Sequence, residues 1–188
     1  SGLGYNRRAR YLHLAAQTIQ TEYSGIIPKH VGSLVALPGI GKNTAAAIMV
    51  YSYNQPLSFI ETNIRTVYLH HFFADDHAVA DSELLPLVEM TLLRDKPREW
   101  YWALMDYGTY LKRIVPNPNR RSKHYTKQSR FEGSKRQLRG AVLRLLKNQN
   151  LSHQEIAVTV PDPRLESVLQ DLAKDGLIHE VKGVISLG

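Results

Sequence analysis

The chain has 188 residues, of which 43% are hydrophobic and 22% charged, and its formal net charge is +7 at pH 7. This length suits one or two small domains with buried cores. The sequence shows no apolar run long enough to cross a membrane and no signal-peptide pattern. It contains no cysteine, which excludes disulfides, cysteine-ligated zinc and a cysteine-ligated iron–sulfur cluster and fits a reducing compartment.

The positive charge is concentrated in one stretch. Between Lys112 and Arg139 there are ten Lys or Arg residues and a single acid, Glu132, whereas the rest of the chain has 14 basic and 16 acidic residues. A local concentration of this kind is typical of proteins that bind a phosphate backbone. The alternative is a basic surface that contacts only solvent.

The first predicted helix covers residues 7–22, because Leu12, Ala15 and Ile19 recur at helical spacing. It follows the segment Gly2-Leu3-Gly4-Tyr5 and has Arg7 and Arg8 near its start. The chain begins with Ser1 inside this segment, so we expect an additional N-terminal segment in the complete protein.

Two further helices, predicted at 31–37 and 42–53, are separated by Pro38-Gly39-Ile40-Gly41. Proline ends a helix, and the two glycines permit positive φ and a close approach to the backbone. The unpaired amides and positive dipole at the start of the second helix attract an anion. The turn is therefore a candidate phosphate site, and the alternative is an ordinary helix–helix turn. The candidate contacts are Pro38, Gly39, Ile40, Gly41, Lys42, Asn43 and Thr44.

A proline-containing loop then leads to Glu61, immediately before a helix predicted from Thr62 to Phe73. A carboxylate at this place can stabilise positive charge on a reacting sugar or orient water. It can equally cap the helix that follows. Asn63, two residues later, is a candidate for supporting the same reaction.

Two more helices complete the first part of the chain. One starts near Asp81, and the other is predicted from Arg98 to Leu111 with Trp100 and Trp102 expected in the core. Beyond it lies a basic segment, residues 112–134, in which Arg120, Arg121 and Lys123 are candidate contacts to a phosphate backbone. The alternative is a flexible basic linker. Adjacent histidines at 70 and 71 diverge by about 100° on a helix, so we predict no metal site there.

Residues 135–188 form a different unit. Their pattern predicts three helices and two strands joined by a Lys182-Gly183 turn. This resembles a winged-helix domain with a two-stranded wing. The expected recognition helix carries both acidic and basic residues, so DNA contact and a structural or protein-binding role are both open. The predicted boundaries are 1–111, 112–134 and 135–188, and the fold class is mainly α.

The order helix, Leu37-Pro38-Gly39-Ile40-Gly41-Lys42, helix, carboxylate, helix resembles the helix-hairpin-helix DNA glycosylases of the endonuclease III superfamily. The segment 2–5, Asn63 and the helix segment Ala103-Leu104-Met105-Asp106-Tyr107-Gly108 are similar to the adenine-specific mismatch glycosylases within it. The resemblance covers residues 2–111 and implies a partial glycosylase core.

The resemblance implies roles for individual residues. Glu61 and Asn63 would be catalytic, although the family has aspartate where Glu61 stands. Tyr5 would insert beside a base, and Arg7 and Arg8 would contact phosphates. The hairpin carbonyls would hold a monovalent cation. The glutamate that protonates the departing adenine would lie upstream, and no residue of this chain matches it.

Two departures from the family have chemical consequences. Bifunctional relatives carry a nucleophilic lysine where this chain has Asn43, so we predict a monofunctional hydrolase without strand cleavage. Most relatives also carry a four-cysteine iron–sulfur loop. Aligned without gaps from Asp106, its four ligand positions fall on Lys112, Asn119, Ser122 and Gln128, so no [4Fe–4S] cluster is expected.

The sequence therefore predicts a DNA base-excision glycosylase that acts on double-stranded DNA with a damaged or mismatched base, with adenine opposite guanine or 8-oxoguanine as the expected target. Two alternatives remain open: a non-catalytic DNA-binding module, and a glycosylase with another specificity such as thymine. We expect no membrane partner and a cytoplasmic, bacterial or archaeal nucleoid-associated location.

Overall fold

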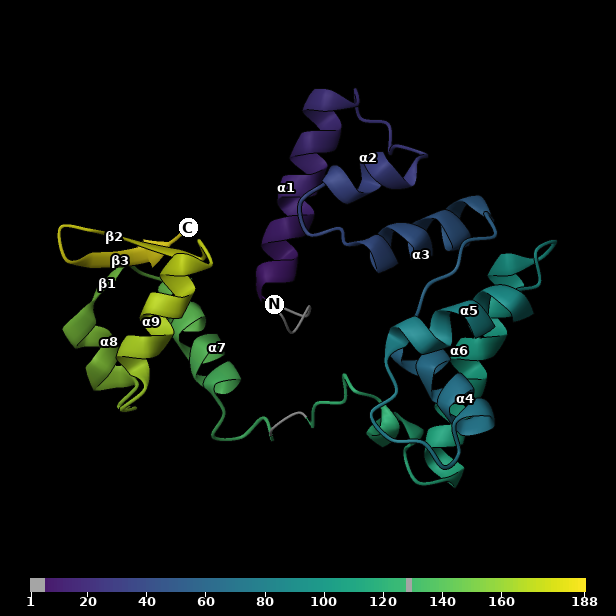
Figure 1. Cartoon of the computed structure of the whole chain (residues 1–188). Coiled ribbons are helices and arrows are strands. Elements are labelled where there is room, and N and C mark those ends of the chain that lie inside the picture. The colour runs from purple at the N-terminus through teal and green to yellow at the C-terminus, as the bar shows by residue number, and fades with distance from the viewer. Residues whose placement is uncertain (1–5, 128–129) are drawn as a thin grey trace. The chain divides into compact units, whose positions relative to one another are not determined.

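The computed structural model describes residues 6–127 and 130–188. Figure 1 labels its helices and strands along the chain. They are α1 (Asn6–Glu22), α2 (Val31–Ala36), α3 (Lys42–Tyr53), α4 (Thr62–Phe72), α5 (Asp81–Thr91), α6 (Pro97–Ile114), the 3₁₀ helix η1 (Pro118–Arg121), α7 (Lys135–Leu146), β1 (Leu151–Ser152), α8 (His153–Thr159), α9 (Leu165–Lys174), β2 (Ile178–Val181) and β3 (Val184–Leu187). No helix among the described residues is both long and apolar enough to span a bilayer.

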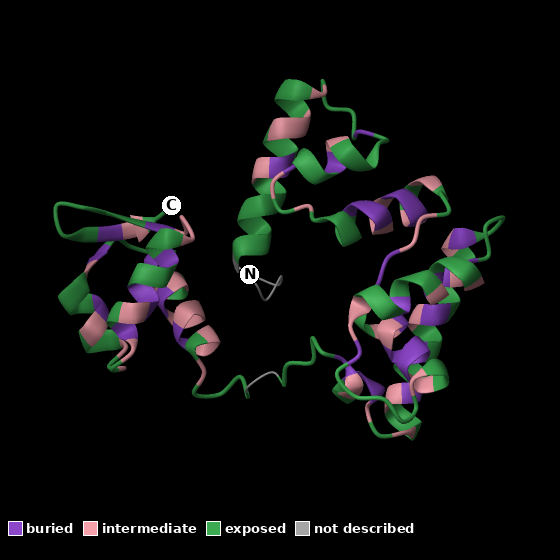
Figure 2. Cartoon of the chain, viewed as in Figure 1, coloured by how far each residue is buried: buried purple, intermediate pink, exposed green. Residues whose placement is uncertain are grey.

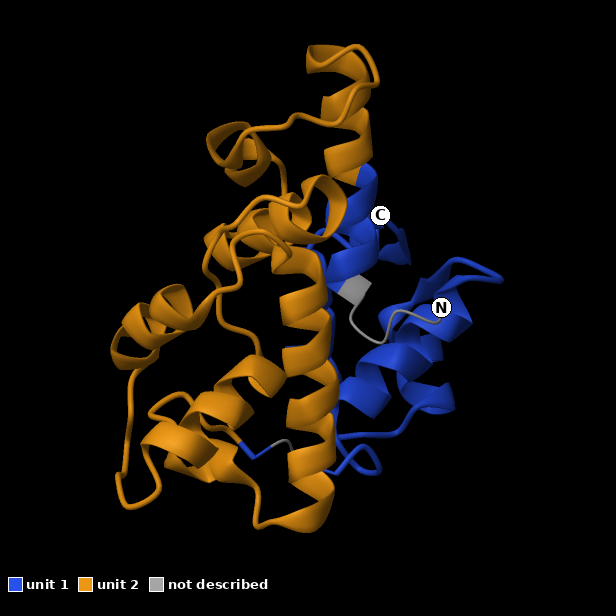
Figure 3. Cartoon of the chain, turned by 90° about the vertical axis from the view of Figure 1, so that its right-hand side faces the viewer, with its two compact units in different colours: residues 1–13, 127–188 blue, residues 14–126 orange. Residues whose placement is uncertain are grey.

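The chain divides into two compact units, coloured separately in Figure 3. One contains residues 14–126 and the other residues 1–13 and 127–188. The sequence-based boundaries at 111 and 134 stay a prediction. Helix α6 continues to Ile114, three residues beyond its predicted end, because apolar Leu111 still packs in the core while Lys112 and Arg113 sit in a last turn that favours cations.

The larger unit has two apolar cores, and the buried positions are purple in Figure 2. The first joins α4, α5 and α6 around fully buried Tyr68, Leu84 and Tyr101. The second joins α1, α2 and α3 around Leu34 and Met49. The prediction that both tryptophans are core residues is wrong for Trp102, which is 53% exposed on the outer face of α6.

The smaller unit confirms a strand-containing helical domain and adds a short third strand to the two that the sequence predicts. Strands β2 and β3 are antiparallel, with Val181 opposite Val184, and the turn residues Lys182 and Gly183 have positive φ of 51° and 78°. Such a turn matches the twist of two antiparallel strands. The sheet has three strands in the order β1-β3-β2, because Leu151 also pairs with Ile185.

The carboxylates on α9 and at its C-terminal end have partners within this unit. Asp175 on the C-terminal end of α9 accepts from Arg139 at 2.6 Å, and Asp171 lies 3.6 Å from Lys135. Glu166 lies 2.8 Å from His153. The expected recognition helix therefore presents carboxylates held by residues of the same domain.

Candidate functional site

The turn between α2 and α3 has the geometry that its proline and two glycines predict. Helix α2 ends at Ala36, and the Leu37 carbonyl accepts from the Ile40 amide at 3.2 Å. Gly39 has φ of +76°, which a residue with a side chain rarely adopts. Gly41 is the N-cap of α3 in an extended conformation and makes no side-chain capping bond.

The start of α3 is open to a ligand. Lys42, Asn43 and Thr44 are exposed, and the first turn contains no acidic residue. A Cβ built on Gly41 would meet nothing within 4 Å. Amides and dipole at this helix end, together with the Lys42 charge, form a surface that is suited to a phosphate.

Glu61 lies at the N-cap of α4 in an extended conformation and is half-buried. Its carboxylate accepts a hydrogen bond from the Asn63 amide at 2.7 Å. Capping uses part of the acceptor capacity of a carboxylate, which has two oxygens and about four lone-pair directions. The capping bond therefore fixes the position of the Glu61 carboxylate and leaves other lone pairs of the carboxylate available to a substrate or a water molecule.

The hairpin is linked directly to the residue that precedes Glu61. The Asn43 side-chain amide donates to the carbonyl of Ile60 at 3.2 Å. Asn43 thus connects the first turn of α3, where a phosphate would bind, with the backbone that carries the candidate catalytic carboxylate.

Tyr101 of α6 holds the loop between α3 and α4 from below. Its hydroxyl donates to the Leu57 carbonyl at 3.1 Å and accepts from the Phe59 amide at 3.4 Å. Its ring stacks on Phe59 with centroids 4.3 Å apart. Burial raises the pKa of Tyr101 to about 12, so the hydroxyl keeps its proton. Burial and then the charge of Glu61 raise the pKa of Tyr51, which packs edge-on to the same rings.

Asn63 is held on three sides. The Lys112 ammonium donates to its side-chain oxygen at 2.5 Å, and its side-chain nitrogen lies 3.9 Å from the Met105 sulfur. Its backbone packs against Gly108, where an added Cβ would lie 2.2 Å from the Asn63 carbonyl oxygen. Gly108 therefore permits the contact between the start of α4 and α6.

The basic segment after α6 packs as far as residue 126 against α4 and the loop that precedes α5. The Arg121 guanidinium donates to the Leu69 carbonyl at 3.3 Å. Val79 donates to the carbonyl of Arg121 and accepts from the amide of Lys123, each at 2.9 Å. The side chains of Arg120 and Lys123 are exposed, so they are available to a polyanion.

Two predicted contacts lie on α1 and one lies before it. Arg7 is 3.5 Å from Asp175, so a carboxylate of the same unit partly balances its charge. Arg8 is exposed. Tyr5 lies outside the described residues.

The positions that the family resemblance assigns to an iron–sulfur cluster do not fit one. Lys112, Asn119 and Ser122 supply an ammonium, an amide and a hydroxyl instead of thiolates; Gln128 lies outside the described residues. Asn119 is 4% exposed, and its side chain donates to Thr66 at 2.5 Å. Over residues 6–127 and 130–188, no group of three or more His, Asp or Glu side chains is placed to hold a metal.

Three residues that position the site were not found as functional candidates in the sequence. Lys112 was only part of the basic run, and Tyr101 had no distinguishing pattern. Gly108 belongs to the helix segment that resembles the family. That resemblance was the one signal in the sequence that could have indicated a close contact between helices at Gly108.

Comparison with known proteins shows which proteins this chain is similar to. No protein-family model matches the chain. An adenine DNA glycosylase of Mycolicibacterium smegmatis is 29% identical over 95% of this chain and 68% of its own length. One of Buchnera aphidicola is 36% identical over 38% of this chain and 20% of its own. A thymine/uracil-DNA glycosylase of Methanothermobacter thermautotrophicus is 26% identical over 56% of this chain and 49% of its own.

A solved structure of a thermostable thymine-DNA glycosylase aligns with 65% of this chain and 54% of that chain, at 25% identity and a TM-score of 0.48. The chain spans about two thirds of the length of the mycobacterial relatives, 68% of one and 66% of another. The sequence similarity to adenine DNA glycosylases confirms the resemblance that the motifs carried. Over nearly its whole length, this chain is similar to adenine DNA glycosylases, at 29% and 27% identity to two mycobacterial proteins of that name.

Proposed function

We propose that this chain carries the hairpin and the catalytic carboxylate of a monofunctional DNA glycosylase for base-excision repair. Its substrate is double-stranded DNA containing adenine opposite guanine or 8-oxoguanine. The observation that carries the proposal is the position of Glu61, which caps α4 and is joined through Ile60 to Asn43 in the hairpin helix. Homology to adenine DNA glycosylases supports the choice of base.

The chemistry follows from this arrangement. Hydrolysis of an N-glycosidic bond builds positive charge on the sugar, and the target nucleotide must leave the base stack to be reached. The start of α3 holds the phosphate beside the flipped nucleotide. The Glu61 carboxylate then stabilises the oxocarbenium-like sugar and orients or deprotonates the attacking water.

The absence of a lyase step follows from Asn43. An amide is not a nucleophile, and this one donates to the Ile60 carbonyl. Lys42 lies one residue away, about 100° round the helix. We therefore expect no covalent adduct with DNA after borohydride treatment, and an adduct that can be trapped would contradict the proposal.

The proposal includes a monovalent cation at the hairpin. The turn from Leu37 to Lys42 has no carboxylate, so neutral backbone carbonyls are the oxygen ligands that it offers. Such a cation would add positive charge beside the bound phosphate. With DNA as the partner, we expect the protein to work beside the nucleoid in the cytoplasm.

The test is single-turnover cleavage of a labelled duplex with adenine opposite 8-oxoguanine, followed by alkali. It uses this chain and an N-terminally extended form, because the proton donor for adenine is expected upstream. Glu61→Gln keeps an oxygen that can cap α4 but removes the charge, so we expect the rate to fall at least 100-fold. Glu89→Gln, an exposed carboxylate on α5, is the matched control and should cleave like the wild type.

The outcomes separate the candidate functions. Cleavage that Glu61→Gln abolishes supports the proposal. Binding without cleavage in both forms of the chain would favour a non-catalytic DNA-binding module, in which Glu61 is only a cap. A parallel duplex with thymine opposite guanine tests the second specificity, which the thymine/uracil-DNA glycosylase relative favours.

A further inference from the structure

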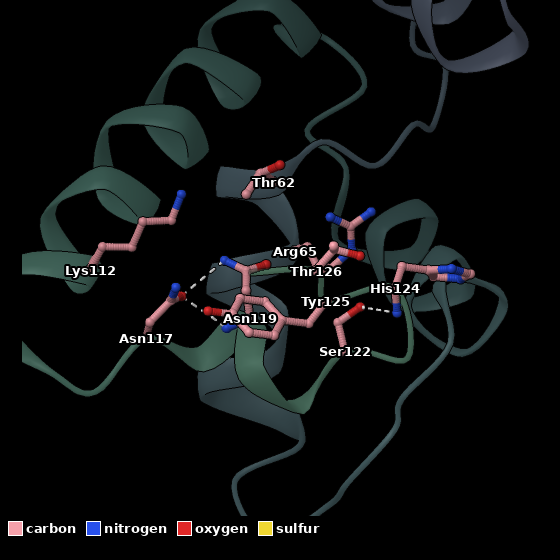
Figure 4. A pocket seen from close by; sticks show the side chains of 9 residues that line it. All are labelled: Thr62, Arg65, Lys112, Asn117, Asn119, Ser122, His124, Tyr125 and Thr126. Carbon is pink, nitrogen blue, oxygen red and sulfur yellow. Dashed lines mark hydrogen bonds between the residues drawn. The ribbon is translucent and has the colours of Figure 1, made fainter. Parts of the chain in front are cut away.

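A cavity of about 230 Å³ lies beside the start of α4, between α6 and the segment that follows it. Figure 4 shows the side chains that line it, which come from α4, α6 and residues 117–126. Lys112, Asn119 and Ser122 are among them. The structure thus brings together three of the four positions where the family resemblance expects cluster ligands, and it surrounds them with polar groups.

Lys112 connects this cavity with the candidate catalytic site. It is half-buried, and its ammonium donates to the side-chain oxygen of Asn63 at 2.5 Å. An ammonium can only donate, so this bond determines which end of the Asn63 amide faces Lys112. The amide nitrogen must then point the other way, toward Met105. A charge-assisted bond of this length is stronger than a bond between neutral groups.

Asn119 attaches the following segment to the second turn of α4, one turn beyond Asn63. Its side chain donates to the Thr66 hydroxyl at 2.5 Å and to the Asn117 side chain at 3.3 Å. The Thr66 hydroxyl in turn donates to the Thr62 carbonyl at 2.8 Å. The polar network therefore ends on the first turn of α4, directly after Glu61.

We propose that Lys112 is a positioning residue for the glycosylase reaction, which sets the orientation of the Asn63 amide through a hydrogen bond. In this chain, the Lys112 ammonium and the buried Asn119 network occupy positions where the resemblance expects the ligands of a metal cluster. The proposal rests on the function proposed above for Glu61 and Asn63. It predicts that loss of the Lys112 donor slows the reaction. It also predicts that the affinity for DNA falls only as much as the loss of any one positive charge would lower it.

The test compares Lys112→Met, Lys112→Gln and Lys112→Arg with Arg113→Met, a matched loss of one exposed charge from the adjacent position of α6. The readouts are the single-turnover rate at saturating DNA, the DNA affinity and the melting temperature. We expect Lys112→Met to slow cleavage at least about tenfold, since small misplacements of reacting groups have effects of this size or larger. Its DNA affinity should match that of Arg113→Met, and Lys112→Arg should restore most of the rate.

A second readout does not need activity. In ¹⁵N-labelled protein, the side-chain amide resonances of Asn63 should move in Lys112→Met and stay in place in Arg113→Met. If the wild type cleaves and Lys112→Met cleaves within twofold of it, the positioning role is wrong while the proposed function stands. If the wild type cleaves neither as this chain nor in the N-terminally extended form, the proposed function fails, and unmoved Asn63 resonances would also refute the Lys112 contact. Lys112→Gln serves the same comparison should Lys112→Met fail to fold.

Discussion

The bond between Asn43 and the Ile60 carbonyl offers a test of whether the hairpin positions Glu61, the candidate catalytic carboxylate. Asn43→Ala removes a hydrogen bond of 3.2 Å, whose net worth is about 1 kcal/mol. Alanine regains up to about 0.6 kcal/mol through its helix propensity. The free energy of unfolding should therefore change by less than about 1 kcal/mol, which shifts the melting temperature by no more than about 4 °C.

The effect on the reaction should be larger than the effect on stability. If the whole bond energy appears in the barrier, about 1 kcal/mol slows cleavage about fivefold. If the loop relaxes by about 1 Å at Glu61, the loss reaches about 100-fold. The assay is single-turnover cleavage at saturating DNA, so that any loss of affinity at the hairpin does not enter the rate.

Two further variants separate positioning from stability. Asn43→Asp cannot donate to Ile60, but its charge stabilises the start of α3, so the rate should fall while the melting temperature does not. Ser52→Ala, at an exposed position of the same helix, should leave both unchanged. Rates for both Asn43 variants within twofold of the wild type would show that the bond has no part in positioning Glu61.

Three other predictions follow from packing, surface charge and titration. Gly108→Ala places a Cβ 2.2 Å from a backbone oxygen of α4 and should lower the free energy of unfolding by about 1–3 kcal/mol or more. The control Gly32→Ala, whose added Cβ has nothing within 4 Å, should not lower it. Equal melting temperatures for the two variants would refute the contact. Arg120→Met with Lys123→Met should reduce the slope of log K against log salt by about 2, and an unchanged slope would remove both residues from the DNA interface. Burial, and then the neighbouring histidine, lower the pKa of His71 from 6.5. Its contribution to the free energy of unfolding is therefore fully present above pH 6.5 and is lost as the pH falls through the lower pKa of the folded state. His71→Gln should diminish that loss in melts between pH 5 and 8.

The elements of the fold follow largely from local sequence signals. The predicted helix at 42–53 matches α3, because Gly41 is its N-cap and Asn54 ends it in the left-handed conformation. The wing was predictable because a Lys-Gly turn sets the pairing of its two strands. The third strand, β1, has only two residues, which is too short to show an alternating pattern.

The site was predictable only in part, since its supports come from distant parts of the chain. Glu61 and the hairpin carry local signals, but Lys112 reaches Asn63 across 49 positions and Tyr101 reaches Leu57 across 44. No periodicity encodes such contacts. Trp102 shows the same limit, because helical spacing does not say which of two tryptophans faces the core.

The clamp formed by Tyr101 bears on the entropy of DNA binding. The loop before Glu61 has no regular structure, yet Phe59 and Ile60 are only 2% and 5% exposed, and the Tyr101 hydroxyl holds Leu57 and Phe59. A loop ordered in the free protein loses little conformational freedom when a ligand arrives. Under the proposed function, binding free energy from the phosphates would then be left for extruding the target nucleotide, and the Glu61 carboxylate would meet the sugar without prior reorganisation.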